Sequence, residues 1–417
     1  MCGIIGKAGV GNVLPQLLNG LKKLEYRGYD SSGVACFEGS AIKRVRALGK
    51  ISELEKKLVE NPKESGVGIG HTRWATHGKP SEENAHPHRS SDGKFYIVHN
   101  GIIENSEEIK KTLLAKDTAY ESQTDTEVFA HLLEKYYNGD VVSAIAKAQA
   151  VLKGAYAFAV LCIDFPYAVF GVASGSPLMA VKCEDGFCVA SDSGAVSCDG
   201  QVCYRIQNGE ICRLTRDSLC FFDAAGSKIH KAGESLSCKE NAFDKCGFDH
   251  FMLKEIYEQA DAVRSTLDSL ITFGSVTLPD VAFDEDFLKE RLNRILIIAC
   301  GSAYHTGLVA KHLIEKMSGI FCCVEIASEF RYSEPLADEN TLAIFVSQSG
   351  ETADTLAGLR LAKRCGAQIL SIVNVRDSVI ETRFIGEIIN ISTQQQPFLM
   401  GILVSVLMGI TLTLPIS

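Results

Sequence analysis

The pattern that most constrains this chain begins at Arg294, where short apolar segments start to alternate with helical stretches. The strand-like segments are residues 295–299, 322–326, 341–346 and 368–375, and the helical ones are residues 306–317 and 353–365. Short, fully apolar strands that alternate with helices are typical of a parallel sheet covered on both faces. We therefore expect an α/β domain over residues 291–376.

The first 240 residues have a different pattern, in which strand-like runs follow one another with few helices between them. The expected strands are residues 67–71, 95–99, 155–163, 167–173, 186–190 and 201–214, and the expected helices are residues 14–24 and 125–137. This order indicates an α+β layered domain with mostly antiparallel sheets. Residues 241–290, with an amphipathic segment at 251–258, are expected to be linker helices.

Composition excludes several classes of protein. At 417 residues the chain is long enough for two or three domains, and its net charge of -9 argues against a broad nucleic-acid-binding surface. The 15 cysteines are scattered without paired C-x-x-C motifs, which favours reduced thiols in the cytoplasm over disulfides or zinc sites. We expect no metal ion and no cofactor.

Cys2 is the first candidate for a catalytic residue. If Met1 is removed, this residue carries a thiol and a free α-amine, so one residue supplies a nucleophile and a base. An α-amine titrates at about 7.7–8.0, so it accepts protons near neutral pH. The simpler alternative is that a cysteine follows the initiator by chance.

The octet from His71 to Gly78 (HTRWATHG) follows a predicted strand and places Arg73 at its end. A guanidinium group can hold a carboxylate with two hydrogen bonds, and Trp74, the one tryptophan of the sequence, could act as a lid. The alternatives are a surface arginine and a core tryptophan. The octet's two histidines, with His86 and His88, are also candidate ligands of a metal ion. Histidines that are hydrogen-bonded within the protein or face solvent are the stronger interpretation.

Two further motifs offer polar groups near strand ends. Asn100-Gly101 is either a simple turn or a pair of donors for an oxyanion. In the segment 122–127, Thr124 or Asp125 could cap a helix, or Asp125 could bind a substrate ammonium group.

Together, Cys2-Gly3-Ile4, residues 25–33 (EYRGYDSSG), the octet and His99-Asn100-Gly101 resemble an N-terminal-nucleophile (αββα) glutamine amidotransferase domain. More narrowly, they resemble the glutamine–fructose-6-phosphate aminotransferase family. The resemblance implies that Cys2 attacks the glutamine carboxamide and that Asn100 and Gly101 hold the oxyanion. It also implies a set of glutamine-binding residues: Arg73, Trp74, Thr76, His77, Gly78 and Asp125.

The second half contains a hexad, residues 347–352 (SQSGET), between a predicted strand and a predicted helix. Hydroxyl and backbone N–H groups at a helix start suit a phosphate monoester, and the hexad lacks the patterns of nucleotide-binding loops. Ordinary helix caps are the alternative. The hexad and residues 325–332 resemble the flavodoxin-like sugar isomerase (SIS) domain of the same family. That resemblance implies fructose 6-phosphate as a substrate, bound by Ser302, Ser347, Gln348, Ser349 and Thr352.

The resemblance stops near residue 375, and residues 377–417 are expected to be an aberrant hydrophobic tail. A frameshift or premature stop, a short paralogue with a new tail, and a membrane anchor are the three explanations, of which the first is preferred. The SIS domain would then be incomplete, the homodimer formed by family members would be in doubt, and no membrane association is expected.

We accordingly expect a cytoplasmic enzyme of this family that keeps glutaminase activity but does not convert the sugar. A non-catalytic sugar-phosphate-binding protein or regulator is the alternative. Amidophosphoribosyltransferases share the first domain, but the hexad at 347–352 argues against them.

Overall fold

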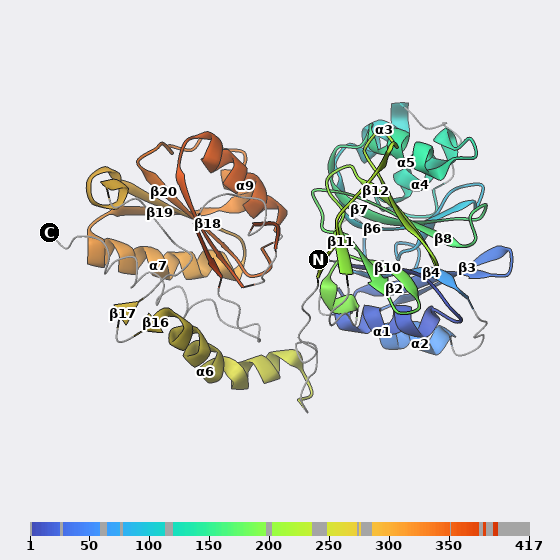
Figure 1. The fold of residues 1–417 in the computed structure, drawn as a ribbon, viewed down its shortest axis with the longest axis horizontal. Coiled ribbons are helices and arrows are strands. Elements are labelled where there is room, and N and C mark those ends of the chain that lie inside the picture. Colours follow the sequence, from blue (N-terminus) through green and yellow to red (C-terminus); the bar gives the residue numbers. More distant parts are fainter. Residues whose placement is uncertain are drawn as a thin grey trace. The chain divides into compact units, whose positions relative to one another are not determined.

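The computed structural model describes residues 2–25, 28–58, 65–75, 78–112, 120–196, 202–235, 248–272, 275–276, 286–350, 352–374, 378–380 and 387–390. The chain divides into two compact units, residues 1–243 and 244–417. Each unit has its own sheets and its own core (Figure 1).

The N-terminal unit contains two antiparallel sheets. The first has the order β15-β11-β9-β10-β1-β4-β2-β3, and its strands are β1 (Gly3–Gly9), β2 (Ser31–Glu38), β3 (Ala41–Leu48), β4 (Val67–Arg73), β9 (Met179–Cys183), β10 (Gly186–Ala190), β11 (Val202–Arg205) and β15 (Glu234–Ser235). The second has the order β14-β13-β12-β8-β7-β6-β5, and its strands are β5 (His88–Arg89), β6 (Phe95–Ile103), β7 (Gly154–Cys162), β8 (Ala168–Ser174), β12 (Ile211–Thr215), β13 (Leu219–Phe222) and β14 (Lys228–Ile229).

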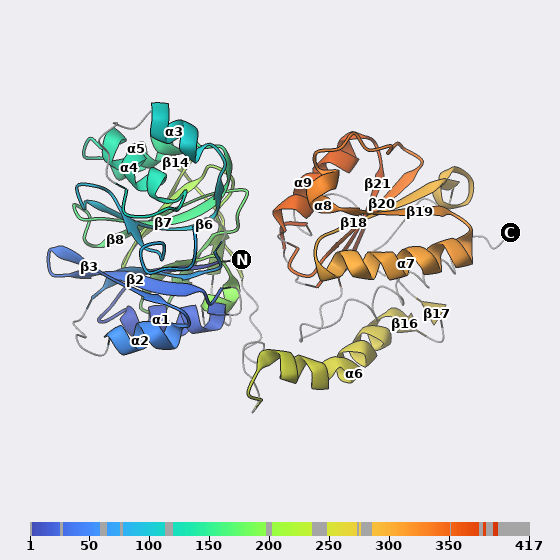
Figure 2. The same ribbon diagram turned by 180° about the vertical axis from the view of Figure 1, so that it is seen from behind.

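Helices cover the outer face of each sheet, which gives four layers (Figures 1 and 2). The helices of this unit are α1 (Leu14–Leu24), α2 (Ile51–Leu58), α3 (Ser106–Thr112), α4 (Glu127–Tyr136), α5 (Val141–Gln149) and the short η2 (Ser193–Ala195). Apolar side chains fill the space between the sheets, with Ile4, Ile69, Val98 and Ala159 all fully buried. The expected αββα architecture is therefore confirmed.

One sequence prediction for this unit was wrong, and one of two alternatives that the sequence left open is excluded. Residues 201–214 were expected to be one strand, but they form β11 and β12, which lie in different sheets. The chain turns between them at Gly209, whose φ of 80° suits a residue without a side chain. Asn100-Gly101 was read as a possible turn, but β6 continues through both residues and pairs with Ala157 and Tyr156 of β7.

The C-terminal unit is built on a parallel sheet with the order β19-β18-β20-β21-β22. Its strands are β18 (Arg294–Ala299), β19 (Phe321–Ile326), β20 (Thr341–Ser347), β21 (Gln368–Val373) and β22 (Glu387–Asn390). In chain order this is 2-1-3-4-5, the flavodoxin-like arrangement, as expected. The expected boundary at residue 376 does not coincide with the end of the sheet, because β22 pairs with β21 beyond it.

Both faces of the parallel sheet are covered, as the uniformly apolar strands predicted. Alternate strand residues such as Ile297 and Ile344 pack with α7 (Ser302–Ser318), and those in between, such as Ile298 and Phe345, pack with α8 (Ala327–Phe330) and α9 (Ala353–Arg364). The unit also contains α6 (Phe251–Leu270), β16 (Ile271–Thr272), β17 (Ser275–Val276) and a π-helix, η4 (Phe287–Arg291).

Candidate active site

Cys2 lies where the two sheets of the N-terminal unit approach one another. It directly precedes β1, whose Gly3 pairs with Thr72 of β4, so the thiol reaches the end of β4. The backbone N–H of Trp74 donates to Cys2 Sγ at 3.3 Å. A pocket opens here, and it is lined by Cys2, Arg73, Trp74, His86, His99, Gly101, Thr124, Asp125 and Thr126.

The Cys2 thiol is only partly exposed, and this determines its protonation. Burial raises its pKa above the usual value, while the Trp74 N–H and the charge of Arg73 lower it by smaller amounts. The net shift is upward, so the thiol is protonated at neutral pH. Because the thiolate is the reactive form, a neighbouring base has to remove this proton before the sulfur can attack.

Asn100 and Gly101 supply hydrogen-bond donors beside the thiol. The side-chain Nδ2 of Asn100 donates to the backbone O of Cys2 at 3.0 Å. Gly101 has φ of 118°, and a Cβ at this position would lie 2.0 Å from the carbonyl O of Ala155. This position therefore requires glycine, and because β6 continues through both residues the Asn-Gly pair does not form a turn.

Arg73 is 3% exposed, so it is not the surface arginine that was the alternative. Its Nη2 donates to the carbonyl O of Gly78 at 3.3 Å. Burial lowers the pKa of the guanidinium, and the acidic groups of Cys2, Asp30 and Asp125 counter this. Arginine keeps its charge in proteins, so the pocket has a fixed cation.

The segment Gly28–Asp30 explains part of the EYRGYDSSG motif. Asp30 accepts a hydrogen bond from the N–H of Ala75 at 2.8 Å, and its own N–H donates to Arg73 O at 3.0 Å. A Cβ on Gly28 would lie 2.6 Å from the Arg73 carbonyl carbon, so glycine permits this close approach. The motif thus holds the end of β4 against the pocket. Tyr26 and Arg27 lie outside the described residues.

Trp74 is 44% exposed, so the core tryptophan that was the alternative is excluded. Its ring contacts Tyr29 edge-to-face, with centroids 5.6 Å apart. The indole therefore lies at the mouth of the pocket beside the thiol. Thr76 and His77, two predicted glutamine-binding residues, lie outside the described residues.

Asp125 does not cap helix α4, contrary to one of the sequence interpretations. The N-cap is Thr126, which makes no capping hydrogen bond with its side chain. Instead, Asp125 is 6% exposed and accepts the N–H of Ile103 at 2.7 Å. The Asp125 side chain thus lines the same pocket as Arg73.

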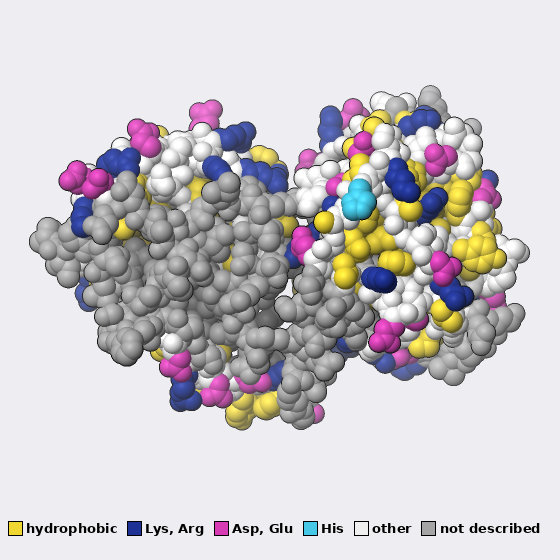
Figure 3. Space-filling view, in the orientation of Figure 1, with side chains coloured by type: hydrophobic (Ala, Val, Ile, Leu, Met, Phe, Trp, Pro, Cys, Tyr) yellow, Lys and Arg dark blue, Asp and Glu magenta, His cyan; other side chains and the backbone are white. Residues whose placement is uncertain are grey.

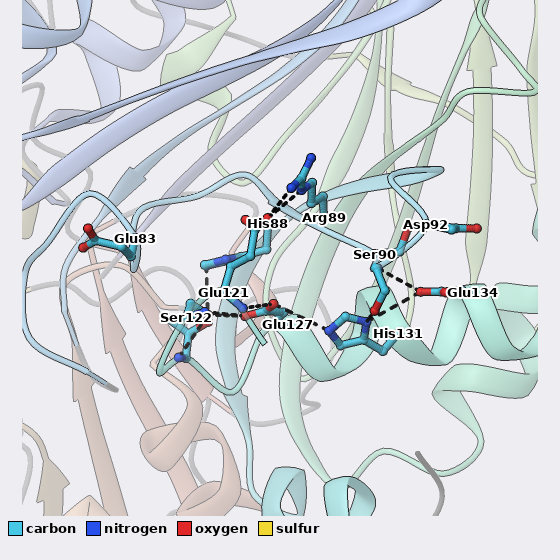
Figure 4. Close-up of polar contacts among 12 residues, drawn as sticks. Glu83, His88, Arg89, Ser90, Asp92, Glu121, Ser122, Glu127, His131 and Glu134 are labelled. Atoms are coloured by element: carbon cyan, nitrogen blue, oxygen red, sulfur yellow. Dashed lines mark hydrogen bonds and ion pairs between the residues drawn. The ribbon is translucent and has the colours of Figure 1, made fainter. Parts of the chain in front are cut away.

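The loop before Asp125 is held by a buried carboxylate, that of Glu127 (Figure 4). Glu127 is 1% exposed and accepts the N–H of Glu121 at 2.6 Å and the N–H and hydroxyl of Ser122 at 2.8 and 2.6 Å. His131, one helical turn later, lies 3.5 Å from the same carboxylate. Sequence reasoning assigned no role to Glu127, although a glutamate two residues after Asp125 was a usable signal.

Four buried histidines, His71, His86, His88 and His99, gather at the pocket, and His86 and His99 line it. The rings of His71 and His86 stack with centroids 4.1 Å apart, and His86 meets His88 edge-to-face at 4.6 Å. Burial lowers the pKa of His71 to about 3, and it also lowers the pKa values of His86 and His88 far below normal. No cluster suited to a metal ion occurs among the described residues. All four histidines are buried, so the solvent-facing interpretation does not hold for them.

The loops of the C-terminal unit lie at the carboxyl edge of its sheet. β18 and β20 are neighbours, and the strand order reverses between them, which is where such sheets bind ligands. Gly301, with φ of 60°, leads from β18 into α7, whose first residue Ser302 is exposed. The hexad begins in the last residue of β20 and ends at the N-cap of α9, Thr352.

Within the hexad, Ser347 is buried and its hydroxyl accepts the N–H of Gly350 at 3.1 Å. Thr352 Oγ1 lies 3.3 Å from the same hydroxyl. Gln348 and Ser349 are half-buried beside them, and Glu351 lies outside the described residues. The Ser347 hydroxyl therefore links the two ends of the loop.

Comparison with known proteins identifies two domains. A glutamine amidotransferase domain model matches residues 71–196, and a SIS domain model matches residues 288–414. The chain is 44% identical over 381 residues to the glutamine–fructose-6-phosphate aminotransferase [isomerizing] of Clostridium tetani, covering 91% of this chain and 62% of that protein. It is also 44% identical over 393 residues to the same enzyme of Gloeobacter violaceus, covering 94% and 64%.

The chain belongs to the glutamine–fructose-6-phosphate aminotransferase family. It spans less than two thirds of the length of the curated relatives that it matches. The C-terminal domain of the glucosamine-fructose-6-phosphate aminotransferase from Francisella tularensis is 33% identical to part of this chain; it matches 41% of this chain and 50% of that domain with a TM-score of 0.36. The family prediction is confirmed, and relatives named as enzymes do not favour the alternative of a non-catalytic binder.

The matches extend into the expected tail. The SIS model continues to residue 414, although residues 391–417 lie outside the described residues.

None of the helices in the described part of the chain combines the length and apolar character of a membrane span. On the face of the N-terminal unit seen in Figure 3, Lys and Arg side chains are interspersed with Asp and Glu.

Proposed function

We propose that this chain is a glutamine-dependent amidotransferase whose N-terminal unit releases ammonia from glutamine through Cys2. One observation carries the proposal: a single pocket gathers a thiol, hydrogen-bond donors, a cation and an anion. Glutamine presents a carboxamide, an α-carboxylate and an α-ammonium group. Each of these groups has a counterpart of suitable chemistry among the pocket residues.

The charged ends of glutamine define its orientation. Arg73 suits the α-carboxylate, because a guanidinium group donates two parallel hydrogen bonds to a carboxylate. Asp125 suits the α-ammonium group. With both ends held, the carboxamide extends toward Cys2. Thr76, His77 and Gly78 complete the proposed binding residues, and Trp74 is placed to cover the carboxamide and to guide the ammonia.

The proposed reaction begins with proton removal from the thiol. Since burial raises the thiol pKa, the α-amine of Cys2, freed by removal of Met1, takes the proton. The sulfur then attacks the carboxamide carbon, and Asn100 Nδ2 and the Gly101 N–H stabilise the oxyanion. The C–N bond breaks, the ammonium group of Cys2 gives its proton to the leaving nitrogen, and water hydrolyses the γ-glutamyl thioester.

The SIS unit supplies the proposed acceptor side. The loops that follow β18 and β20 offer N–H and hydroxyl groups to a phosphate monoester at the reversal of strand order. We propose fructose 6-phosphate as the ligand, held near Ser302, Ser347, Gln348, Ser349 and Thr352, and glucosamine 6-phosphate as the product of the complete reaction. Homodimers formed through this unit remain a prediction.

We place this chemistry in the cytoplasm, as part of amino-sugar synthesis. The twelve cysteines of the described residues are all free thiols, as expected for a reducing compartment.

The test is ammonia release from glutamine by purified chain and by Cys2→Ala. A matched control is Cys220→Ser, because Cys220 is a partly exposed free thiol on β13 that does not line the pocket. The wild-type chain and Cys220→Ser should each release one ammonia for every glutamate formed. Cys2→Ala should release neither product. Equal activity in Cys2→Ala would refute the nucleophile, and an inactive wild-type chain would refute the proposed function.

A further inference from the structure

His71 makes two contacts that decide how its imidazole is protonated. Its Nε2 lies 2.9 Å from the backbone O of His99 and 3.1 Å from Oδ1 of Asn100. A backbone carbonyl only accepts hydrogen bonds, so Nε2 has to carry the hydrogen. Burial lowers the pKa of His71 to about 3, so the ring is neutral at physiological pH and its single N–H is on Nε2.

This tautomer fixes the orientation of the Asn100 amide. The oxygen and nitrogen of an asparagine amide have nearly the same size, so packing alone does not distinguish the two orientations. A donor at His71 Nε2 selects the orientation in which Oδ1 faces the histidine. Nδ2 then faces Cys2, where it donates to the Cys2 carbonyl O at 3.0 Å.

The opposite orientation of the Asn100 amide would prevent it from stabilising the proposed oxyanion. It would turn Nδ2 toward the Nε2–H of His71, leaving two donors opposed in a buried space. It would also turn Oδ1 toward the Cys2 carbonyl O and toward the negative charge that forms during attack. An acceptor at that position repels an oxyanion, whereas a donor stabilises it.

We propose that His71 is a positioning residue that holds the Asn100 amide with its donor toward the reacting carbonyl. The inference rests on the proposed glutaminase function. His71 lies two residues before Arg73 on β4, so both side chains project from the same face of the strand. One strand therefore carries the substrate-binding cation and the group that orients the oxyanion donor.

The neighbouring histidines support the arrangement. His86 stacks on the His71 ring, and its Nδ1 accepts the backbone N–H of His99 at 3.2 Å. His99 Nδ1 lies 2.9 Å from the hydroxyl of Thr126, at the start of the helix that follows Asp125. These contacts fix the His99 carbonyl, which in turn fixes the hydrogen on His71.

The experiment compares His71→Leu with His71→Gln in steady-state glutamine hydrolysis. Leucine removes the donor, whereas the terminal amide of glutamine places an N–H near the position of Nε2. His71→Leu should lower kcat by roughly 10- to 100-fold with little change in KM, because it affects transition-state stabilisation more than binding. His71→Gln should recover most of this loss.

A double-mutant cycle with Asn100→Ala tests whether His71 acts through Asn100. In the Asn100→Ala background, His71→Leu should cause no further loss of kcat, because the amide to be oriented is absent. The control is Gln149→Leu, which removes another buried side chain that donates to two carbonyl groups, those of Gly209 and Ala224. It should lower the melting temperature and leave kcat unchanged.

The outcomes separate the two claims. If the wild-type chain releases no ammonia, the proposed function falls and this inference falls with it. If the wild-type chain is active but His71→Leu keeps a normal kcat, or its loss adds fully to that of Asn100→Ala, the inference alone is overturned. Should His71→Leu fail to fold, ¹⁵N spectra of histidine in the wild-type chain decide: an Nδ1–H tautomer for His71 contradicts the inference, and a neutral Nε2–H tautomer supports it.

Discussion

Asn100 is joined to Cys2 by a hydrogen bond of 3.0 Å from its side-chain Nδ2 to the Cys2 backbone O. The two residues are 98 positions apart in the sequence and come from different sheets. Through this contact, the packing of one sheet on the other determines where the proposed oxyanion donor, Asn100 Nδ2, lies relative to the thiol. The geometry of the site is therefore a property of the layered fold, and changes to either strand should affect it.

Replacing Arg73 should weaken glutamine binding. Arg73→Lys keeps the charge but loses the paired donors, and loss of a hydrogen bond to a charged group costs about 1.5–3 kcal/mol. We expect KM for glutamine to rise by roughly 10- to 100-fold, with a smaller change in kcat. Initial rates over a range of glutamine concentrations measure this, and an unchanged KM would contradict the assignment.

Gly101→Ala should damage both stability and activity. The left-handed φ of 118° and the 2.0 Å approach to Ala155 O leave no space for a methyl group, so β6 has to shift away from β7. Strained backbone of this kind costs about 1–3 kcal/mol. Urea unfolding should show the loss of stability, and kcat should fall because the Gly101 N–H moves. As a control, Gly139→Ala changes another glycine of positive φ, at which a Cβ meets no atom within 4 Å. Gly139→Ala introduces backbone strain away from the pocket, so its kcat should stay at the wild-type value. An equal loss of kcat in Gly101→Ala and Gly139→Ala would argue against a special role for Gly101.

Glu127→Gln should displace the loop that carries Asp125. The carboxylate accepts three hydrogen bonds from Glu121 and Ser122, and an amide replaces one acceptor oxygen with a donor that faces them. We expect a rise in KM for glutamine and a melting temperature lower by several degrees, since the group is buried. An unchanged KM in a destabilised variant would restrict Glu127 to a structural role.

The buried histidines predict that stability falls in mild acid. Burial lowers the pKa values of His71, His86 and His88 in the folded chain, whereas in the unfolded chain they titrate near 6.5. Below about pH 6.5 the unfolded state therefore binds more protons, and stability decreases as pH falls. Each histidine contributes up to about 1.4 kcal/mol per pH unit, so three give a slope of up to about 4 kcal/mol per pH unit well below pH 6.5.

Trp74 makes the pH dependence of stability measurable for the N-terminal unit alone. It is the only tryptophan of the sequence and lies in the N-terminal unit, so its fluorescence follows the unfolding of that unit. Urea titrations between pH 5 and pH 7 should give the predicted slope, and His88→Gln should reduce it by about a third. A stability that is independent of pH over this range would show that the histidines have the same pKa values in the folded and unfolded states, and would contradict the lowered values.

Much of the fold was predictable because its signals are local. The helix at residues 14–24 and the strand at 186–190 have the predicted bounds, and the alternation after Arg294 predicted the doubly covered sheet. The division of residues 201–214 between two sheets was not predictable from apolar pattern, because both halves have strand character. Only the turn at Asn208-Gly209 hinted at it.

In the candidate site too, features with local sequence signals were predictable and features that depend on packing were not. The motifs made Cys2, Arg73 and Asp125 candidates, the family resemblance implied glutamine as their substrate, and the structure brings them to one pocket. The roles of His71 and Glu127 depend on contacts across 29 and 5 residues, respectively, and on burial that no single motif encodes. Motifs and the family resemblance predicted the chemical groups, and three-dimensional packing shows what orients them.

The most direct test of the central claim is the mass of the N-terminal peptide after rapid acid quench of the chain with glutamine. The account predicts a peptide that begins at Cys2, without Met1, and carries one γ-glutamyl group on the Cys2 sulfur. Ammonia release without this modification, or equal turnover by chain that retains Met1, would contradict it.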